Sequence, residues 1–302
     1  MRGRRVILAG AVATVVGLVV GSPAAAQREQ GWAVRESLSN PDTPLYNTAK
    51  QKLLDGGQVF TYTIASLDPE FYCEVAPHYD FIFFEMQHST MSWADVEAMI
   101  AACPGVGVPM VRLPDVLEGS IQKATDIGAL GIIVPMVDDA DKIRNAVTFA
   151  KFPPMGKRSQ GGGQYRALWG NDYRRTANDN IMIIAMIESP AGVANAAEIA
   201  GVPGVDVVFA ASSDLGSFSG KRQGDPEYEA LVTAIEAGTL GADRLLGGPL
   251  AWMSTRAPYR FFQGPGTTSL IRRGASVVLE AATPCRELPA GVAPIEGEER
   301  CR

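Results

Sequence analysis

A regular alternation of short apolar runs and amphipathic stretches fills residues 58–264 and constrains the fold more than any other feature. Several runs, above all residues 181–187, are continuously apolar, which is typical of parallel strands buried on both faces. Eight runs rich in β-branched and aromatic residues are expected strands: residues 58–65, 80–87, 108–113, 131–136, 181–188, 205–211, 244–248 and 259–264. Eight strands with intervening helices predict an α/β fold, a single-domain (β/α)8 barrel of the TIM type.

Most of the connecting stretches have helical patterns. The first begins at Ser92, an N-cap residue type, with Asp95 three residues further on. An open, doubly wound sheet would show the same alternation, but no GxGxxG pattern follows the first strand. Residues 156–180 are rich in Gly, Arg and polar residues and interrupt the rhythm, which predicts a long functional or mobile loop. The expected helices are residues 92–102, 139–150, 191–200 and 228–238.

The N-terminus has the composition of an export signal. Arg2, Arg4 and Arg5 precede an apolar run over residues 6–20, and small residues follow a Ser-Pro break. This predicts a secretory signal peptide over residues 1–26, with an arginine pair that loosely resembles a twin-arginine signal. The alternative is an uncleaved anchor, although the run is short for a membrane span. We therefore expect an exported, periplasmic or secreted protein with no stable membrane span after signal cleavage.

The remaining chain divides into an N-terminal arm (27–50), a barrel domain (51–280) and an irregular C-terminal tail (281–302). The hydrophobic content of 46% and charged content of 20% are ordinary for a globular protein. The net charge is −6, and no basic cluster lies in the body of the chain. These properties argue against a nucleic-acid partner, and mild acidity indicates solubility more often than a specific partner.

The chain contains four cysteines, and export would place them in an oxidising compartment. Four cysteines permit three pairings. We favour Cys73–Cys103, which would join two neighbouring barrel helices, and Cys285–Cys301, which would close the tail. Four independent thiols are the alternative, and no CxxC or Cys/His spacing suggests zinc.

Polar side chains at the carboxyl ends of strands are the first candidates for a barrel active site. Glu188 follows seven apolar residues, so its carboxylate would lie at the barrel mouth at the end of an apolar strand. A carboxylate in such surroundings needs a cation or a proton. Asp214 follows the next strand. Two carboxylates on adjacent strands suit a hard divalent ion that keeps open positions for substrate. The alternative reading makes Asp214 a helix N-cap and places Glu188 in an ion pair.

Two further residues at strand ends carry suitable chemistry. His88, after the second strand, titrates near neutral pH and suits proton transfer, unless it only caps or packs. Arg112 ends the third strand, and its planar guanidinium can bind a carbonyl or a carboxylate, unless it forms a surface ion pair. His78 precedes the second strand, at the opposite end of the barrel, so we assign it no role.

These motifs together resemble the HpcH/HpaI aldolase / citrate lyase family, and within it the metal-dependent 2-oxo-acid aldolases such as 4-hydroxy-2-oxoheptanedioate aldolase. The resemblance implies a (β/α)8 barrel, a divalent metal ion (Mg2+, Mn2+ or Co2+), and a homo-oligomer, a trimer or a hexamer with exchanged C-terminal helices. The matching motifs, in chain order, are residues 80–88, 111–112, 126–128, 134–136, 152–156, 187–188 and 204–215.

The resemblance also implies roles for individual residues. Glu188 and Asp214 correspond to the metal ligands, and Arg112 to the arginine that steadies the keto oxygen of pyruvate. His88 corresponds to the general base, and Asp126 to the acid that orients it.

Four residues correspond to substrate-binding positions besides Arg112. The backbone amides of Ser213 and Asp214 would hold the substrate carboxylate, while Tyr62 and Gln87 would line the site. The chain also departs from the family pattern: Glu-Met-Gln-His at residues 85–88 replaces Asp-Gly-Glu-His, which removes one acidic charge beside the base.

The expected activity is that of a carbon–carbon lyase of the class II aldolase type. It would cleave or form 4-hydroxy-2-oxo acids through a pyruvate enolate, with a 2-oxo acid and an aldehyde as small-molecule partners. One alternative keeps the site but assigns a larger or aromatic substrate. The other is an exported binding protein that has lost catalysis.

Overall fold

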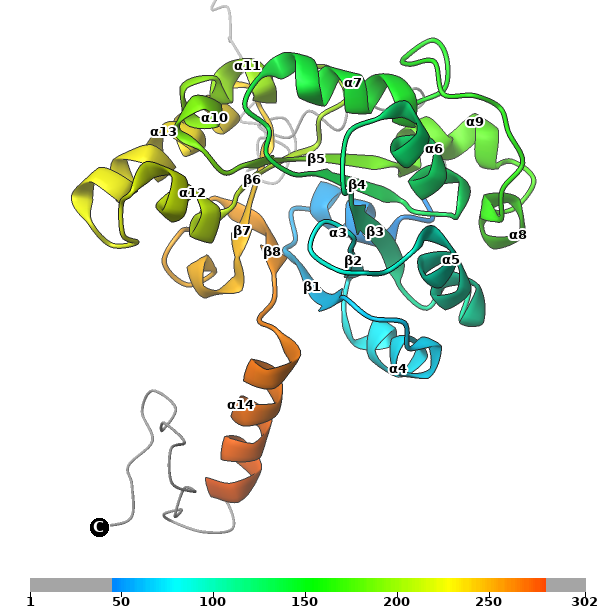
Figure 1. Cartoon of the computed structure of the whole chain (residues 1–302), viewed down its shortest axis with the longest axis horizontal. Helices are drawn as coiled ribbons and strands as arrows, with labels where there is room; N and C mark the ends of the chain where they lie inside the picture. Colours follow the sequence, from blue (N-terminus) through cyan, green and yellow to red (C-terminus); the bar gives the residue numbers. More distant parts are fainter. Residues whose placement is uncertain (1–44, 281–302) are drawn as a thin grey trace, which may run out of the picture.

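The computed structural model describes residues 45–280 (Figure 1). The expected signal peptide, most of the N-terminal arm and the tail lie outside the described residues. So do Cys285 and Cys301, and their pairing stays a prediction.

Eight parallel strands form a closed barrel in which each strand pairs with the next and β8 pairs with β1, with Val59 opposite Phe261. All eight predicted strands are present and the predicted fold class is confirmed. Most strands are one to three residues shorter than the predicted runs. The strands are β1 (Val59–Ile64), β2 (Phe81–Glu85), β3 (Val108–Arg112), β4 (Gly131–Val134), β5 (Met182–Ile187), β6 (Val207–Ala210), β7 (Leu245–Pro249) and β8 (Tyr259–Gln263).

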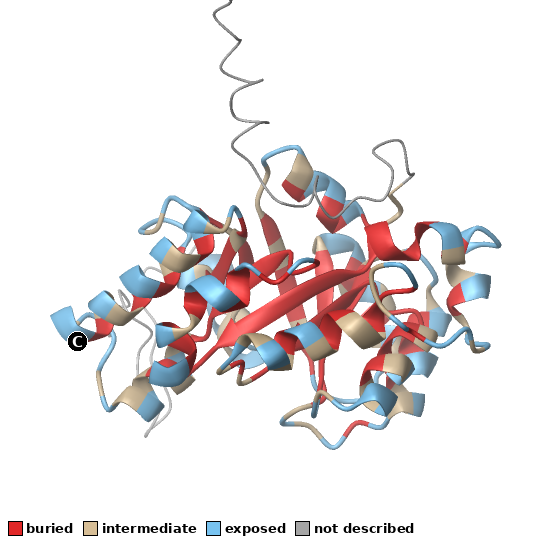
Figure 2. Ribbon diagram, turned by 90° about the horizontal axis from the view of Figure 1, so that it is seen from above, coloured by how far each residue is buried: buried red, intermediate tan, exposed pale blue. Residues whose placement is uncertain are grey.

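The core has two layers, one inside the barrel and one between the barrel and its helices. Along β5, Met182, Ile184 and Met186 point inward, whereas the residues between them pack outward against helices. Strand residues are therefore buried on both faces, as Figure 2 shows for the sheet as a whole. This double burial explains why the sequence of β5 is continuously apolar.

The helices that cover the barrel begin close to the predicted positions. Ser92 forms a capping box with Asp95: its hydroxyl accepts from the Asp95 N–H at 3.3 Å, and its own N–H donates to the Asp95 carboxylate at 2.7 Å. The predicted helix over residues 191–200 is divided at Asn195. The covering helices are α4 (Pro69–Val75), α5 (Trp93–Ala102), α6 (Glu118–Asp126), α7 (Ala140–Ala150), α10 (Pro190–Ala194), α11 (Ala196–Ala200), α12 (Ser212–Ser219) and α13 (Pro226–Gly241).

The segment 156–180 is more ordered than its composition indicates, because it contains α8 (Tyr165–Trp169) and α9 (Tyr173–Asn180). Arg158 is buried beneath them, with its guanidinium 5.3 Å from the centre of the Tyr165 ring. It donates to the Tyr173 hydroxyl at 2.8 Å and to Asp126 at 2.9 Å. The expectation of a long loop is thus wrong for the second half of the segment, where the polar residues have internal partners.

An internal ionic cluster lies at the amino end of the barrel, which α3 (Thr48–Leu54) covers. The Lys50 ammonium lies 3.2 Å from the Asp206 carboxylate, and both side chains are buried. Lys151 donates to the carbonyls of Asn178, at 2.6 Å, and Ile181. Burial, with Lys50 as a second cause, lowers the pKa of Lys151 to about 7. This end of the barrel is therefore closed, and the carboxyl end is the one that can take a ligand.

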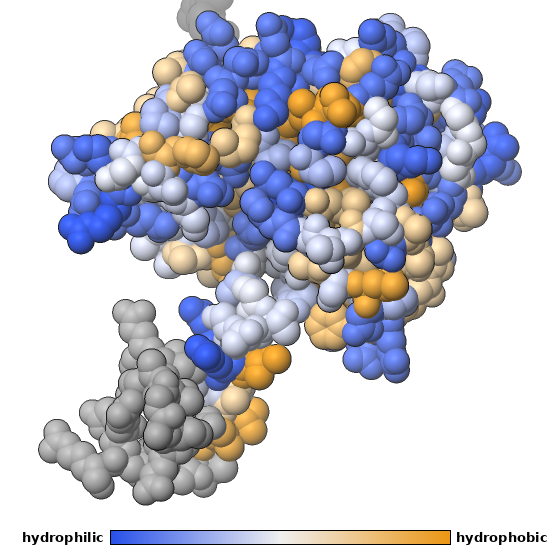
Figure 3. Space-filling view, in the orientation of Figure 1, coloured by the Kyte–Doolittle hydropathy of each residue, from blue (hydrophilic) through white to orange (hydrophobic). Residues whose placement is uncertain are grey.

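The last described helix, α14 (Thr267–Glu280), extends away from the barrel (Figure 1). Ile271, Val277 and Val278 are at least 65% exposed. Figure 3 shows apolar surface on this projecting helix. Within residues 45–280, no helix is both long and apolar enough to cross a membrane.

The predicted Cys73–Cys103 disulfide is present and joins α4 to the residue that ends α5, with the two Cα atoms 5.6 Å apart. In the chain, α4 precedes β2 and α5 follows it. β2 ends at Glu85, and the turn after it leads to His88.

We expect the Cys73→Ser/Cys103→Ser double variant to lose about 3 kcal/mol of unfolding free energy, because the bond closes a loop of 30 residues. Urea titrations of the variant and of the wild type, with and without reductant, measure this loss. Equal stability of all samples would contradict the expectation.

Candidate active site

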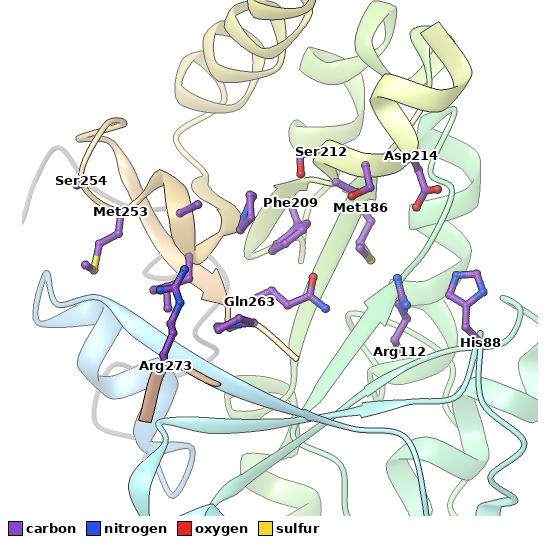
Figure 4. Close-up of a pocket in the computed structure, with 17 residues that line it drawn as sticks. His88, Arg112, Met186, Phe209, Ser212, Asp214, Met253, Ser254, Gln263 and Arg273 are labelled. Carbon is purple, nitrogen blue, oxygen red and sulfur yellow. The ribbon is translucent and has the colours of Figure 1, made fainter. Parts of the chain in front are cut away.

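A cavity of about 560 Å3 opens at the carboxyl ends of the strands. Figure 4 shows His88, Arg112 and Asp214 at one end of it, Arg273 at the other, and Gln263 between them. Its lining consists of His88, Arg112, Met186, Phe209, residues 211–214, residues 249–251, Met253, Ser254, residues 263–265 and Arg273. The cavity thus lies at the end of the barrel where the sequence analysis places the chemistry.

Arg112 ends β3 and points into the barrel, where it is almost fully buried. Its Nη2 donates to the carboxylate of Glu85, which ends the neighbouring strand β2. The guanidinium also lies over the Phe83 ring, 5.5 Å from its centre. Its Nε has no hydrogen-bond partner among the described residues. The ion pair and the ring hold the guanidinium in place beside the cavity.

The Glu85 carboxylate also organises the turn that carries His88. Its Oε1 accepts from the N–H groups of Gln87, at 2.7 Å, and His88, at 3.0 Å. The His88 side chain is exposed and lines the cavity. Gln87, predicted as a substrate-binding residue, is not part of the lining, and its buried side-chain oxygen has no partner within residues 45–280.

Glu188 follows β5 directly, and its side chain continues the inward series of Met182, Ile184 and Met186. It is 1% exposed, so it does not line the cavity surface itself. Its Oε2 accepts from the Met136 N–H at 2.5 Å, whereas its Oε1 has no hydrogen-bond partner in the described chain. The alternative reading of Glu188 as one half of an ion pair therefore fails, since none of the ion pairs formed by the described residues includes it.

The electrostatics at Glu188 are those of a carboxyl group short of positive charge. Burial raises the pKa of Glu188 to about 7, although the Met136 hydrogen bond acts in the opposite direction. The charge of Asp214 raises this pKa further, while Arg112 lowers it. Both residues are thus close enough to Glu188 to act on it.

Asp214 lies in the first turn of α12, directly after β6. The N-cap residue of this helix is Ala211, and Asp214 lies inside the helix, so the N-cap alternative is wrong. Ser213 and Asp214 both line the cavity, which brings the start of α12 to the site. A helix N-terminus presents unpaired amides and favours a bound anion such as a carboxylate.

Glu188 and Asp214 together fit a divalent cation. The unpaired Oε1 of Glu188 and the mutual repulsion of the two acids are both relieved by positive charge. No group of three or more His, Cys, Asp or Glu side chains suited to a metal occurs in the described part of the chain. A cation held by this pair would keep positions for water and substrate.

Within one chain Asp126 does not contact His88, so the orienting role implied by the resemblance stays a prediction. It ends α6, which runs back from the carboxyl end of β3, so it lies at the amino end of the barrel. There it pairs with Arg158 and accepts from Gln122 at 2.8 Å. His88 lies at the opposite end of the barrel.

Tyr62 is also placed differently from its expected role. It points outward from β1 and packs against Phe71 and Tyr79, with ring centres 5.6 and 5.7 Å away. Its hydroxyl shares a hydrogen bond with Thr267, the first residue of α14. It therefore braces the outer wall and does not line the cavity.

Gln263 and Arg273 line the cavity but were not predicted. Gln263 ends β8, so the search for polar residues at strand ends had the means to find it. Arg273 lies beyond the last strand, in α14, and no strand-end pattern identifies it.

The chain belongs to the HpcH/HpaI aldolase/citrate lyase family, which it matches over residues 72–251. It is 36% identical over 177 residues to a hydroxypyruvate/pyruvate aldolase of Delftia acidovorans, covering 56% of this chain and 65% of the relative. It is 31% identical over 160 residues to a 2-keto-3-deoxy-L-rhamnonate aldolase of Escherichia coli, covering 51% and 60%. The chain thus spans less than two thirds of the length of these curated relatives.

Solved structures agree with this assignment. A family protein from Burkholderia cenocepacia superimposes with a TM-score of 0.69 at 25% identity, covering 78% of this chain and 99% of the other. The citrate synthase SbnG superimposes with a TM-score of 0.66 at 26% identity, covering 78% and 97%.

The raised pKa of Glu188 predicts how metal binding depends on pH. A metal ligand must be ionised, so below pH 7 a proton competes and Mn2+ affinity should fall about tenfold per pH unit. Calorimetric titration of the wild type at a series of pH values on both sides of 7 measures this slope. An affinity that stays constant across the series would refute it, and Glu188→Gln is the control expected to bind poorly throughout.

Proposed function

We propose that this protein is a divalent-metal-dependent carbon–carbon lyase that cleaves or forms 4-hydroxy-2-oxo acids. The observation that carries the proposal is the pair of carboxylates of Glu188 and Asp214, neither of which forms an ion pair within residues 45–280. Arg112 and His88 line the same cavity. The aldolase names of the relatives from Delftia acidovorans and Escherichia coli support the reaction class.

Glu188 and Asp214 would hold the metal ion. When bound, Mg2+, Mn2+ or Co2+ would supply Lewis-acid stabilisation of negative charge on a substrate oxygen. Carboxylate ligands favour these hard ions over softer ones.

Arg112 would face the keto oxygen of a pyruvate-like unit. Glu85 and Phe83 hold its guanidinium in place before substrate arrives, so little reorganisation is needed as charge develops. The amides at the start of α12, at Ser213 and Asp214, would accept the substrate carboxylate.

His88 would move the proton. It takes the proton of the C4 hydroxyl as the C3–C4 bond breaks, which gives the aldehyde and leaves the electron pair on the enolate of pyruvate. A proton delivered to C3 then completes pyruvate. Exposure at the cavity gives His88 access to the substrate, and its backbone is fixed through Glu85.

Substrates of this class with different carbon skeletons fit the cavity. A cavity of about 560 Å3 with Phe209, Met186 and Met253 in its wall accepts an aldehyde fragment larger than the pyruvate end, including an aromatic one. A binding protein without catalysis is the third candidate. It would need no base, whereas His88 stands at the cavity.

Two features of the whole protein are also proposed. The exposed apolar residues of α14 suit a homo-oligomer, a trimer or hexamer, in which this helix packs on another copy.

The disulfide between Cys73 and Cys103 supports an exported, periplasmic or secreted location, because such bonds persist in oxidising compartments.

The decisive experiment measures pyruvate release from a panel of 4-hydroxy-2-oxo acids with Mn2+, with and without chelator. We expect activity that the chelator abolishes, and a loss of at least about 100-fold in Glu188→Gln and Asp214→Asn, because the charge stabilisation is lost. Lys123→Met, an exposed substitution on α6, is the matched control and should be fully active. Full activity of the Glu188→Gln/Asp214→Asn double variant would end the proposal.

A further inference from the structure

The segment between β4 and α7, residues 135–139, lies against the end of β5 that carries Glu188. The Val137 N–H donates to the Met186 carbonyl at 2.9 Å, and the Ser189 hydroxyl donates to Asp138. A Cβ atom at Gly192 would lie 2.5 Å from the Val137 carbonyl oxygen, so no side chain fits at that position. The segment is therefore held tightly on both sides of Glu188.

Met136 is the strained point of this segment. Its φ is 53°, in the left-handed region that residues other than glycine rarely adopt, at a cost of about 1 kcal/mol or more. In this conformation its N–H reaches Glu188 Oε2 at 2.5 Å, while its carbonyl accepts from Lys142 Nζ at 2.7 Å. The two bonds hold the peptide groups on either side of the Met136 Cα, and together they fix its φ and ψ.

Lys142 is well placed for this contact. It lies in the first turn of α7, where its own N–H donates to the N-cap Asp139 at 2.8 Å, and its half-buried stem leads back to Met136. A hydrogen bond from an ammonium group is roughly twice as strong as one between neutral groups. It can therefore offset the strain at Met136.

We propose that Lys142 is a positioning residue for the metal centre, acting on Glu188 through the backbone of Met136. By holding the Met136 carbonyl, it keeps the neighbouring N–H on Oε2 of Glu188 and leaves the unpaired Oε1 for the ion. The metal part of this inference rests on the proposed function, whereas the hold of Lys142 on Met136 does not.

The test compares Lys142→Met and Lys142→Arg with the wild type. Mn2+ dissociation constants come from electron paramagnetic resonance of metal-free protein titrated with Mn2+, without substrate. Hydrogen exchange of the Met136 amide comes from protein labelled with 15N-methionine, with the signal assigned by Met136→Leu. Thermal melts report the fold of each variant, and Lys123→Met controls for the loss of one positive charge.

We expect Lys142→Met to bind Mn2+ at least about 10-fold more weakly, as is usual when a residue that orients a ligand is lost. Its Met136 amide should exchange faster by a similar factor, because the bond to Glu188 is no longer held. Lys142→Arg should recover most of both properties, and Lys123→Met should match the wild type.

Unchanged exchange and unchanged Mn2+ affinity in Lys142→Met would overturn the proposal. Equal losses in Lys142→Met and Lys123→Met would also overturn it, since overall charge would then be the cause. A wild type that binds no Mn2+ would refute the proposed function instead. Exchange at Met136 would then decide the role of Lys142: faster exchange in Lys142→Met supports its hold on Met136, and unchanged exchange refutes it.

Discussion

The buried, unpaired carboxylate of Glu188 is the constraint on which the rest of the site depends. A strand that is apolar on both faces delivers it to the barrel mouth, where it forms no ion pair although Arg112 and Lys142 lie close enough to lower its pKa. The contrast with the amino end is clear, because there the buried Asp206 lies 3.2 Å from Lys50. At the amino end the buried acid thus has a cationic partner, whereas the acid at the carboxyl end forms no ion pair and lies next to a cavity.

Much of this arrangement could be predicted from the sequence, because strands that are buried on both faces consist of apolar residues. The eight strands and the positions of Glu188, Asp214, Arg112 and His88 at their carboxyl ends follow from the apolar runs and what ends them. The Cys73–Cys103 pairing followed from placing both cysteines on adjacent helices.

The predictions for Tyr62 and for residues 165–180 differ from the structure for physical reasons. Tyr62 lies in a strand whose alternation does not distinguish the inner face from the outer one, since both faces are buried. The motif that carries Asp126 does not say at which end of its helix the residue lies, and within one chain it pairs with Arg158. The order of residues 165–180 depends on internal partners such as Arg158 and Tyr173, which polar composition alone does not reveal.

The closed amino end has a consequence for the order of events at the site. With α3 and the Lys50–Asp206 pair across one end, ligands enter and leave the described cavity through the same mouth. If the proposed cleavage takes place there, a fragment held near Arg112 and Glu188 would leave only after the fragment nearer the rim. Release would then be ordered, and the inner fragment would compete with the next substrate molecule.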